Sequence, residues 1–286
     1  MMNQNNLYIQ KASGEKAIFS PDKLSKSLQR SGADSETVDY VLRKVQESLY
    51  EGIPTKKIYR MAFNLLKKQS YKHASKYKLK QAIMELGPSG FPFEKYVAEL
   101  LKKQGYEAKT NEIIQGHCVK HEVDVVAMKD EKHFMIECKF HNEAGFNTDV
   151  KVPLYIYARF KDIEQQWVQL PGHDHKLHQA WVVTNTKFSE DALQYGTCMG
   201  MNLIGWNYPI KESLRELIDR EKLYPVTCLH TLTAREKEAI LNLGYVLSMD
   251  ICDNPKILSQ VHITVSRQSS IIEECKQLCH NGGTHE

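Results

Sequence analysis

Asp124, Glu137 and Lys139 are two carboxylates and an amine, residue types that together can bind a metal ion and activate water. Two carboxylates held side by side repel each other and raise each other's pKa, and a divalent cation between them removes the repulsion. Hard oxygen ligands suit Mg²⁺ or Mn²⁺, and an adjacent lysine can orient a water and stabilise charge on a phosphate. This chemistry is metal-assisted hydrolysis of a phosphodiester bond.

The three side chains meet only if the chain forms a hairpin around them. Residues 121–127 and 133–140 are rich in β-branched and apolar residues, with polar residues between, so we predict two paired strands. Pairing Val126 with Met135 puts the two carboxylates opposite each other on one sheet face, and the lysine two places further along shares that face. The alternative is an ordinary edge hairpin with solvated charges.

The spacing of the three groups, written D-(x12)-E-x-K, resembles the motif of the PD-(D/E)xK nucleases. We also predict an amphipathic helix from Phe93 to Gln104, with Glu94 in its first turn, where a carboxylate also stabilises the helix dipole. Phe93-Glu94 followed by Gly105-Tyr106 resembles the start of the Mrr-like branch of restriction-endonuclease folds. That resemblance implies that Glu94 reaches the metal site directly or through water.

The segment that follows the hairpin alternates helix and strand. We predict a helix over residues 150–162, a buried strand over 180–186, a helix opening at Phe188 and a strand over 201–206. Strands alternating with helices indicate an α/β sandwich. The order of strand, Thr-Asn, helix and strand resembles the end of the Mrr-like fold, so the resemblance covers residues 91–208. Lys151 and Tyr155 are the candidates for a supporting polar group from the first of these helices.

Several histidines and cysteines have spacings that also occur in metal sites. His117 and His121 precede the Asp124 strand, and we prefer active-site-loop histidines that contact DNA over a zinc site. His141, just after Lys139, is a third candidate for DNA contact or is a surface residue. The remaining metal alternatives are the imidazole-rich loop 172–178, which is more typical of an exposed loop, and the isolated set Cys275, Cys279 and His280.

The first third of the chain predicts a small hairpin followed by helices. Residues 7–11 and 16–19 form two short strands, and Ser20-Pro21-Asp22 opens a helix. A further helix opens at Thr55, and the last spans about 70–86. Residues 7–85 hold 16 Lys and Arg against 8 Asp and Glu, so this third is basic and suits a polyphosphate or nucleic-acid partner, although a solvated helical surface has the same composition.

This third resembles the ATP-cone, a nucleotide-sensing domain. The resembling residues are Ile9-x-Lys11-x-x-Gly14, Phe19-x-x-Asp22-Lys23-Leu24, Ile53-x-Thr55-x-x-Ile58 and Tyr71-x-x-Ala74-x-x-Tyr77-x-Leu79. The resemblance implies that Lys11, Lys23, Thr55 and Lys80 hold ATP or dATP as a regulatory ligand. Ala12 stands where the family usually has Arg, a departure from the binding pattern. A domain used only for oligomer contacts is the alternative.

The last third is predicted to be helical. We expect a helix over 209–219 and another that begins at a Thr233 cap and ends in a turn at Gly244. This helix–turn–helix unit is equally typical of a DNA-backbone contact and of a small helical cap. His280 to Glu286 are expected to be disordered. The chain has no apolar run of 18 residues and a polar N-terminus, and its seven cysteines form no regular framework, so we expect a cytoplasmic protein with reduced thiols.

The sequence therefore predicts an α/β fold in three parts. These are an α-rich ATP-cone at residues 7–86, a restriction-endonuclease-like α/β/α domain at 91–208, and a small helical C-terminal region at 209–280 that is a candidate for DNA contact. The predicted function is a Mg²⁺- or Mn²⁺-dependent DNA endonuclease regulated by an adenine nucleotide, in a homo-oligomer without membrane contact. A nucleotide-responsive DNA-binding protein without catalysis, and a repair or junction nuclease rather than a defence enzyme, remain as alternatives.

Overall fold

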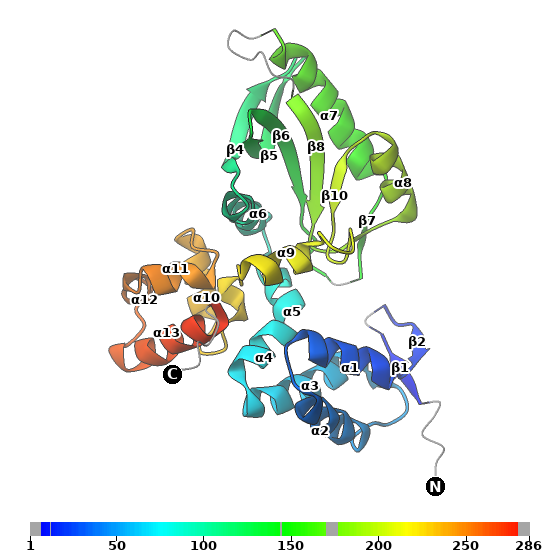
Figure 1. Cartoon of the computed structure of the whole chain (residues 1–286), viewed down its shortest axis with the longest axis vertical. Helices are drawn as coiled ribbons and strands as arrows, with labels where there is room; N and C mark the ends of the chain where they lie inside the picture. Colours follow the sequence, from blue (N-terminus) through cyan, green and yellow to red (C-terminus); the bar gives the residue numbers. More distant parts are fainter. Residues whose placement is uncertain (1–6, 12, 144, 170–176, 280–286) are drawn as a thin grey trace.

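A computed structural model describes residues 7–11, 13–143, 145–169 and 177–279, and the chain folds into three parts (Figure 1). A mixed sheet with its helices forms the upper part of the view, the N-terminal domain lies below it, and the C-terminal helices lie beside the N-terminal domain. Ala12, loop residues 172–176 and His280 to Glu286, on which predictions were made, lie outside the described residues. No helix in the described ranges is long and apolar enough to cross a membrane.

The N-terminal domain combines a three-stranded sheet with helices. Its elements are β1 (Tyr8–Gln10), β2 (Lys16–Ile18), α1 (Pro21–Arg30), α2 (Ser35–Gln46), β3 (Ile53–Pro54) and α3 (Thr55–Gln69). The predicted hairpin is confirmed, and Ser20 caps α1 by accepting a hydrogen bond from the Lys23 N–H. The sequence did not predict β3, which pairs parallel to β1. This third strand fixes the start of α3 beside the hairpin.

The helix predicted over 70–86 is two helices, α4 (Tyr71–Tyr77) and α5 (Leu79–Met84), with a one-residue break at Lys78. The break separates two sets of packing partners. Ala74 and Tyr77 belong to the core of the N-terminal domain. Leu79 and Ile83, by contrast, belong to a larger core that continues into the sheet domain and the C-terminal helices. The end of the predicted ATP-cone is therefore part of the core that joins the three parts.

The central domain is built on a five-stranded sheet with the order β10-β8-β6-β5-β4. Strands β4, β5 and β6 are antiparallel, whereas β6, β8 and β10 run parallel. The elements are α6 (Phe91–Lys103), β4 (Glu107–Gln115), β5 (Lys120–Lys129), β6 (Lys132–Lys139), β7 (Asn147–Thr148), α7 (Lys151–Trp167), β8 (Leu177–Thr184), β9 (Lys187–Phe188), α8 (Glu190–Cys198) and β10 (Asn202–Ile204). The predicted sandwich of strands and helices is present, with β4 as an edge strand that we had not predicted.

Two apolar cores cover the two faces of this sheet. On one face Val125, Ile136 and Trp181 pack with α6 and the C-terminal helices. On the other face Met135 and Val182 pack with α7 and α8. Figure 1 shows α7 and α8 together along one side of the sheet and α6 on the opposite side. The arrangement places the first turn of α6 near the ends of β5 and β6, where the predicted carboxylates lie.

The C-terminal part is helical, as predicted. It contains α9 (Leu214–Glu221), the 3₁₀ turn η2 (Val226–Cys228), α10 (Ala234–Asn242), α11 (Ser248–Asp253), α12 (Lys256–Gln260) and α13 (Val265–Cys279). The helix predicted over 209–219 begins only at Leu214, because Ser213 caps it by accepting from the Glu216 N–H. The Thr233 cap of α10 is confirmed and forms a capping box with Glu236. Gly244, with a φ of +84°, ends α10 against the side chain of Lys95 in α6.

Candidate active site

The hairpin of β5 and β6 has the predicted register. Val126 pairs with Met135, and the ladder ends one step further on at the pair Val125 and Ile136. Asp124 is the next residue of β5, and its Oδ2 accepts a hydrogen bond of 2.7 Å from the Cys138 N–H. A carboxylate therefore takes the place of a backbone partner where the ladder opens. The opening leaves room for Asp124 and Glu137 to lie side by side.

A local distortion of β5 turns Asp124 toward β6. Val123 packs in the core beneath α7, whereas Val125 packs in the core on the α6 face, so the alternation of faces is broken between them. The neighbouring strand β4 is also distorted there, because Asn111, which stands between the pairs on either side of Asp124, has a positive φ of 56°. Sequence alternation alone does not reveal this break.

The carboxyl groups near this opening influence one another electrostatically. Burial and the charge of Asp124 together raise the pKa of Glu137 to about 7, against the opposing effect of Arg159. Burial also raises the pKa of Glu94 to about 7, with Asp124 as the next cause. The pKa of Asp124 is raised by burial and lowered by its hydrogen bond from Cys138. Glu94 of α6 thus acts within the same electrostatic environment as the two strand carboxylates.

Arg159 of α7 is a site residue that the sequence analysis missed. Its Nη1 donates to Glu137 Oε2 at 2.7 Å, and its Nη2 donates to the Glu122 carbonyl oxygen. The side chain is only 9% exposed, so the ion pair is shielded from water. The signal was available, because Arg159 stands at helical spacing among the inward-facing Ile156 and Ile163. An arginine in an apolar stripe requires a buried partner.

Lys151 and Tyr155, the residues of α7 that were predicted to support the site, take no part in the ion pair between Arg159 and Glu137. Tyr155 is 63% exposed, and its ring lies 5.4 Å from the Arg159 guanidinium carbon. Lys151 is exposed in the first turn of α7. Lys139, at the end of β6, is exposed, pairs in register with Thr184 of β8, and lowers the pKa of Asp124 through its charge. The structure therefore keeps Lys139 within electrostatic reach of Asp124 and exposed to solvent.

His117 and His121 belong to a loop that is held by Asp162 of α7. His121 Nε2 and Asp162 Oδ2 are 2.7 Å apart, and the Cys118 N–H donates to Asp162 Oδ1 at 2.8 Å. The His117 N–H donates to the Asp162 carbonyl oxygen, which leaves the exposed ring of His117 facing outward from the loop. These contacts hold the pKa of Asp162 well below its usual range, with the His121 hydrogen bond as the first cause. His121 is thus an anchor of the loop.

His141 fastens the end of β6 to the end of β8. Its backbone N–H donates to Asn185 Oδ1 at 2.9 Å, and Asn185 Nδ2 donates back to the His141 carbonyl oxygen at 2.8 Å. The ring nitrogen Nε2 lies 3.0 Å from the hydroxyl of Thr148, which is buried. Both the ring and the backbone of His141 therefore have structural partners, two residues beyond Lys139.

The donor set at the opening suits a hard cation. Among the described residues no group of three or more His, Cys, Asp and Glu side chains is arranged to hold a metal ion. The set is instead a pair of carboxylates, Asp124 and Glu137, and burial raises the pKa of both, so a cation bound there would favour their ionised forms. Oxygen ligands of this kind fit Mg²⁺ or Mn²⁺ when water or a phosphate completes the coordination. Arg159 would share Glu137 with such an ion.

The structure brings some of the predicted nucleotide-binding residues together. The parallel pairing of β1 with β3 ends at Gln10 and Pro54, so Lys11 and Thr55 each follow the last paired residue of their strand, and Lys23 lies in the first turn of α1. Lys11 Nζ is 2.9 Å from Glu15 Oε2. Lys80 instead lies in α5 with its Nζ 5.3 Å from the centre of the Trp206 ring, and burial lowers its pKa to about 8. Lys80 therefore faces the sheet domain.

The remaining metal alternatives have no described donor cluster. Cys275 and Cys279 are buried free thiols on α13, and burial contributes to the raised pKa of both. A buried, protonated thiol is a poor metal ligand.

Comparison with known proteins gives matches to two family models. Residues 87–207 match the Mrr catalytic model, described as "Restriction endonuclease", and residues 224–279 match a model described as "AF1548-like, C-terminal". An uncharacterized protein of Archaeoglobus fulgidus is 38% identical over 183 residues, which cover 64% of this chain and 99% of that protein. The crystal structure of AF1548, a protein of unknown function, is similar with a TM-score of 0.56 and 37% identity, covering 67% of this chain and 98% of that chain. Both matched models lie beyond residue 86.

Proposed function

Because this chain belongs to the AF1548-like family and carries a restriction-endonuclease domain at residues 87–207, we propose that it is a Mg²⁺- or Mn²⁺-dependent endonuclease that hydrolyses DNA. The observation that carries the proposal is the closeness of Asp124 and Glu137 where the β5–β6 ladder opens, close enough for the charge of Asp124 to raise the pKa of Glu137. Buried carboxylates that repel each other are costly to a fold unless they serve a ligand. Strongly raised pKa values in such a group are typical of a functional site.

In this mechanism Asp124 and Glu137 would hold the cation. Glu94 of α6 would add a third negative charge beside it. The cation supplies positive charge to a phosphate oxygen and lowers the pKa of the attacking water. Lys139, exposed at the strand end, orients that water and stabilises the charge that develops on the phosphate. Arg159 holds Glu137 in place and favours its ionised form, against the burial that raises its pKa. The exposed ring of His117 is available for contact with the DNA backbone.

We also propose that adenine nucleotide binding to the N-terminal domain regulates the nuclease. The proposal is supported by the places of Lys11 and Thr55, which directly follow the paired ends of β1 and β3, and of Lys23 at the start of α1. Free N–H groups at the start of α3 and nearby lysines favour a triphosphate. The last helix of the domain, α5, packs in the core shared with the sheet domain and the C-terminal helices, which provides a route for coupling.

The test is cleavage of supercoiled and linear plasmid DNA with Mg²⁺, Mn²⁺ or EDTA, in the presence and absence of ATP and dATP. Asp124→Asn keeps the shape of the side chain and removes its charge. Asp130→Asn, in the exposed turn of the same hairpin, is the matched control. Metal-dependent cleavage by the wild type and the control but not by Asp124→Asn supports the nuclease. Equal cleavage with and without nucleotide would reject the regulation.

One observation favours a second candidate, a nucleotide-responsive DNA-binding protein without catalysis. Glu137 already has a buried cationic partner in Arg159, which neutralises part of the charge that a metal ion would use. DNA binding by the wild type without cleavage under any metal condition would favour this candidate. Repeating the assay on branched and modified DNA distinguishes a repair or junction nuclease from this non-catalytic protein.

A further inference from the structure

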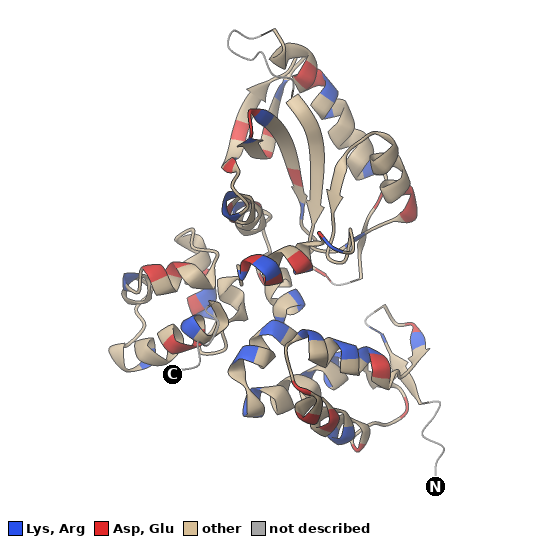
Figure 2. Ribbon diagram, in the orientation of Figure 1, with Lys and Arg blue, Asp and Glu red and all other residues tan. Residues whose placement is uncertain are grey.

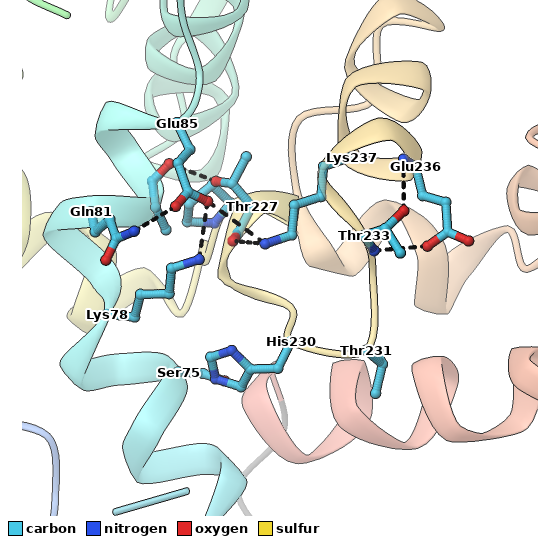
Figure 3. Close-up of polar contacts among 12 residues, drawn as sticks. Ser75, Lys78, Gln81, Glu85, Thr227, His230, Thr231, Thr233, Glu236 and Lys237 are labelled. Atoms are coloured by element: carbon cyan, nitrogen blue, oxygen red, sulfur yellow. Dashed lines mark hydrogen bonds and ion pairs between the residues drawn. The ribbon is translucent and has the colours of Figure 1, made fainter. Parts of the chain in front are cut away.

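A cavity of about 600 Å³ lies between the N-terminal domain and the C-terminal helices. Helices α3 and α5 form one side of it, and the segment from His230 to Lys237 forms the other. Its lining residues are Pro54, Lys56, Lys57, Tyr59, Arg60, Phe63, Asn64, Lys67, Lys78, Gln81, His230, Leu232 and Lys237. Figure 3 shows Lys78, at the break before α5, and Gln81 of α5 facing Lys237 and His230 across this junction. The volume lies in the usual range for small-molecule sites.

The lining is strongly cationic. Six of the lining residues are Lys or Arg, and none is Asp or Glu. Glu85 stands beside the cavity and is shared by two lysines, since Lys78 Nζ lies 3.0 Å and Lys237 Nζ 3.6 Å from its Oε2. Figure 2 shows that Lys and Arg are also frequent along α4 and α5 next to this junction. One carboxylate cannot balance this number of cations, so the cavity favours an anion.

The cations are held in place by buried contacts. Lys237 is only 9% exposed, and its Nζ donates to the Thr227 carbonyl oxygen at 2.8 Å. Burial and the charge of the neighbouring Lys78 together lower the pKa of Lys237 to about 8, against the opposing effect of Glu85. A lysine that is buried beside another lysine is destabilised by both effects. An anion in the cavity would relieve both costs.

The segment that carries Lys237 is tied to the N-terminal domain. Ser75 Oγ lies 2.9 Å from His230 Nε2, and Thr227 Oγ1 donates to the Ala82 carbonyl oxygen at 2.6 Å. Glu274 of α13 accepts from the backbone N–H groups of His230 and Thr231. The two walls of the cavity are therefore fixed relative to each other, and a ligand between them would contact both domains at once.

Apolar side chains complete the walls. Tyr59 and Phe63 project from α3, and Leu232 lies opposite them in the C-terminal part. The Tyr59 ring is stacked on Tyr77 at 4.9 Å between centroids, and Phe63 contacts the His230 ring edge-on at 5.0 Å. Apolar and aromatic walls with charged groups among them are typical of sites for organic ligands. A ligand with both a polyanionic and an apolar part matches this lining.

We propose that the junction cavity binds a nucleoside polyphosphate and that Lys237 and the His230 segment of the C-terminal domain complete the site. The phosphates contact Arg60, Lys67 and Lys237, and the organic part lies against Tyr59 and Phe63. The ligand then acts as a clamp between the two domains. This inference deepens the proposed nucleotide regulation and rests on it, but it assigns the phosphates to the junction and not to the hairpin set of Lys11, Lys23 and Thr55.

The test is titration of the full chain with ATP, dATP and inorganic tripolyphosphate by calorimetry. Arg60→Ala and Lys237→Met should each raise the Kd for ATP by roughly tenfold or more, because each removes a charged partner of a phosphate. Lys67→Ala is a third variant on the accessible rim of the cavity, for use if Lys237→Met fails to fold. Lys11→Ala with Lys23→Ala is the comparison at the hairpin set, and Lys44→Ala, exposed on α2, is the control.

The outcomes separate the two proposals. Weaker binding in the junction variants alone supports the clamp, and hydrogen exchange of residues 227–237 should then slow on addition of ATP. Weaker binding only in the hairpin variants overturns the clamp while the regulation stands. Absence of binding by all three probes overturns both. Tight binding of a single-stranded oligonucleotide that is lost in the junction variants, without nucleotide binding, would identify a nucleic-acid groove and overturn the clamp.

Discussion

Arg159 Nη1 donates to Glu137 Oε2 at 2.7 Å, which joins α7 to β6 across the opening of the strand ladder. Both side chains are largely buried, so the pair is more than a surface contact. Burial and the charge of Asp124 nevertheless raise the pKa of Glu137 to about 7. The arginine thus orients the carboxylate without fully compensating its charge, and this residual deficit is what a divalent cation would fill.

Replacing Arg159 by Met is expected to weaken metal binding. Glu137 loses the cation that favours its ionised form, so its pKa rises, and it also loses the contact that fixes its orientation. Loss of an interaction that orients a metal ligand typically lowers metal affinity by about 10–100-fold. The effect should be larger at pH 6.5 than at pH 8.5, because at the higher pH the carboxylate ionises without help. Calorimetric titration with Mn²⁺ at the two pH values measures it.

Lys161→Met is the matched control for this experiment. Lys161 lies on the same helix, is exposed, and pairs with Glu164. Equal loss of affinity in both variants would mean that the charge of the helix matters and the contact with Glu137 does not. Tighter Mn²⁺ binding in Arg159→Met would mean that the arginine competes with the cation, which supports the protein without catalysis.

Metal binding and cleavage should rise steeply as the pH passes through about 7. Glu94 and Glu137 both have a pKa of about 7, so each is largely protonated and unable to support a cation at pH 6. Plasmid cleavage at constant Mg²⁺ between pH 5.5 and 8.5 measures this dependence. Glu137→Gln removes the activity, and Glu94→Gln should shift the midpoint to lower pH because one repelling charge is gone. A rate that is flat across this range would contradict the assignment.

The same carboxyl groups predict how stability depends on pH in the absence of metal. Their pKa values are raised above the ordinary value of 4.5, so the folded state binds more protons than the unfolded state between pH 4.5 and 7. The free energy of unfolding must therefore fall as the pH rises through this interval. Melting temperatures in EDTA should show the fall, Glu137→Gln should reduce it, and Mg²⁺ should restore stability at pH 8.

The register of the β5–β6 hairpin could be predicted because it depends on local information. Two strands joined by a short turn have few ways to pair, and the pairing of Val126 with Met135 fixes every other pair. The position of Arg159 relative to Glu137 depends on how α7 crosses the sheet, which is a tertiary property. The local break at Asp124 is equally hidden, since it arises from the packing of Val123 and Val125 into different cores.

Domain organisation was predictable only in outline. The periodicity of residues 70–86 predicts a helix, but it does not reveal that Lys78 separates residues packed in two different cores. Leu79 and Ile83 are apolar residues at helical spacing in either case. Their partners in α6 and the C-terminal helices come from distant parts of the chain. The same limit hid the cavity, because no sequence pattern places His230 beside Ser75.

Replacing Lys139 by Ala should reduce DNA cleavage by about a hundredfold or more while metal binding remains, because a positioned amine contributes on this order to a proton-transfer or charge-stabilising step. Lys139 is exposed, so the fold should be unaffected. Lys132→Ala, at the other end of the same strand, is also exposed and is the control. Single-turnover cleavage with saturating Mg²⁺ measures the step directly. Unchanged cleavage in Lys139→Ala would remove this lysine from the mechanism.

Asp162→Asn should destabilise the protein without abolishing its chemistry. The Asp162 carboxylate accepts from the Cys118 N–H and contacts His121, and these bonds hold its pKa well below its usual range. A depressed pKa stabilises the folded state above the unfolded pKa, and this stabilisation is lost as the pH falls. Asp162→Asn should therefore lower the melting temperature at pH 7 and flatten its fall in acid.

Glu164→Gln is the control. Glu164 lies two residues further along α7 and pairs with the exposed Lys161, so this variant should leave the melting curve nearly unchanged. Zinc should not raise the melting temperature of either variant, because the His121 ring contacts Asp162 and is not a metal ligand. A large stabilisation of the wild type by Zn²⁺ that Asp162→Asn abolishes would instead make this loop a metal site. The cleavage rate per folded molecule then shows what the loop does. An unchanged rate in Asp162→Asn would indicate that the loop only positions β5, and a lower rate would indicate that it also contacts the DNA.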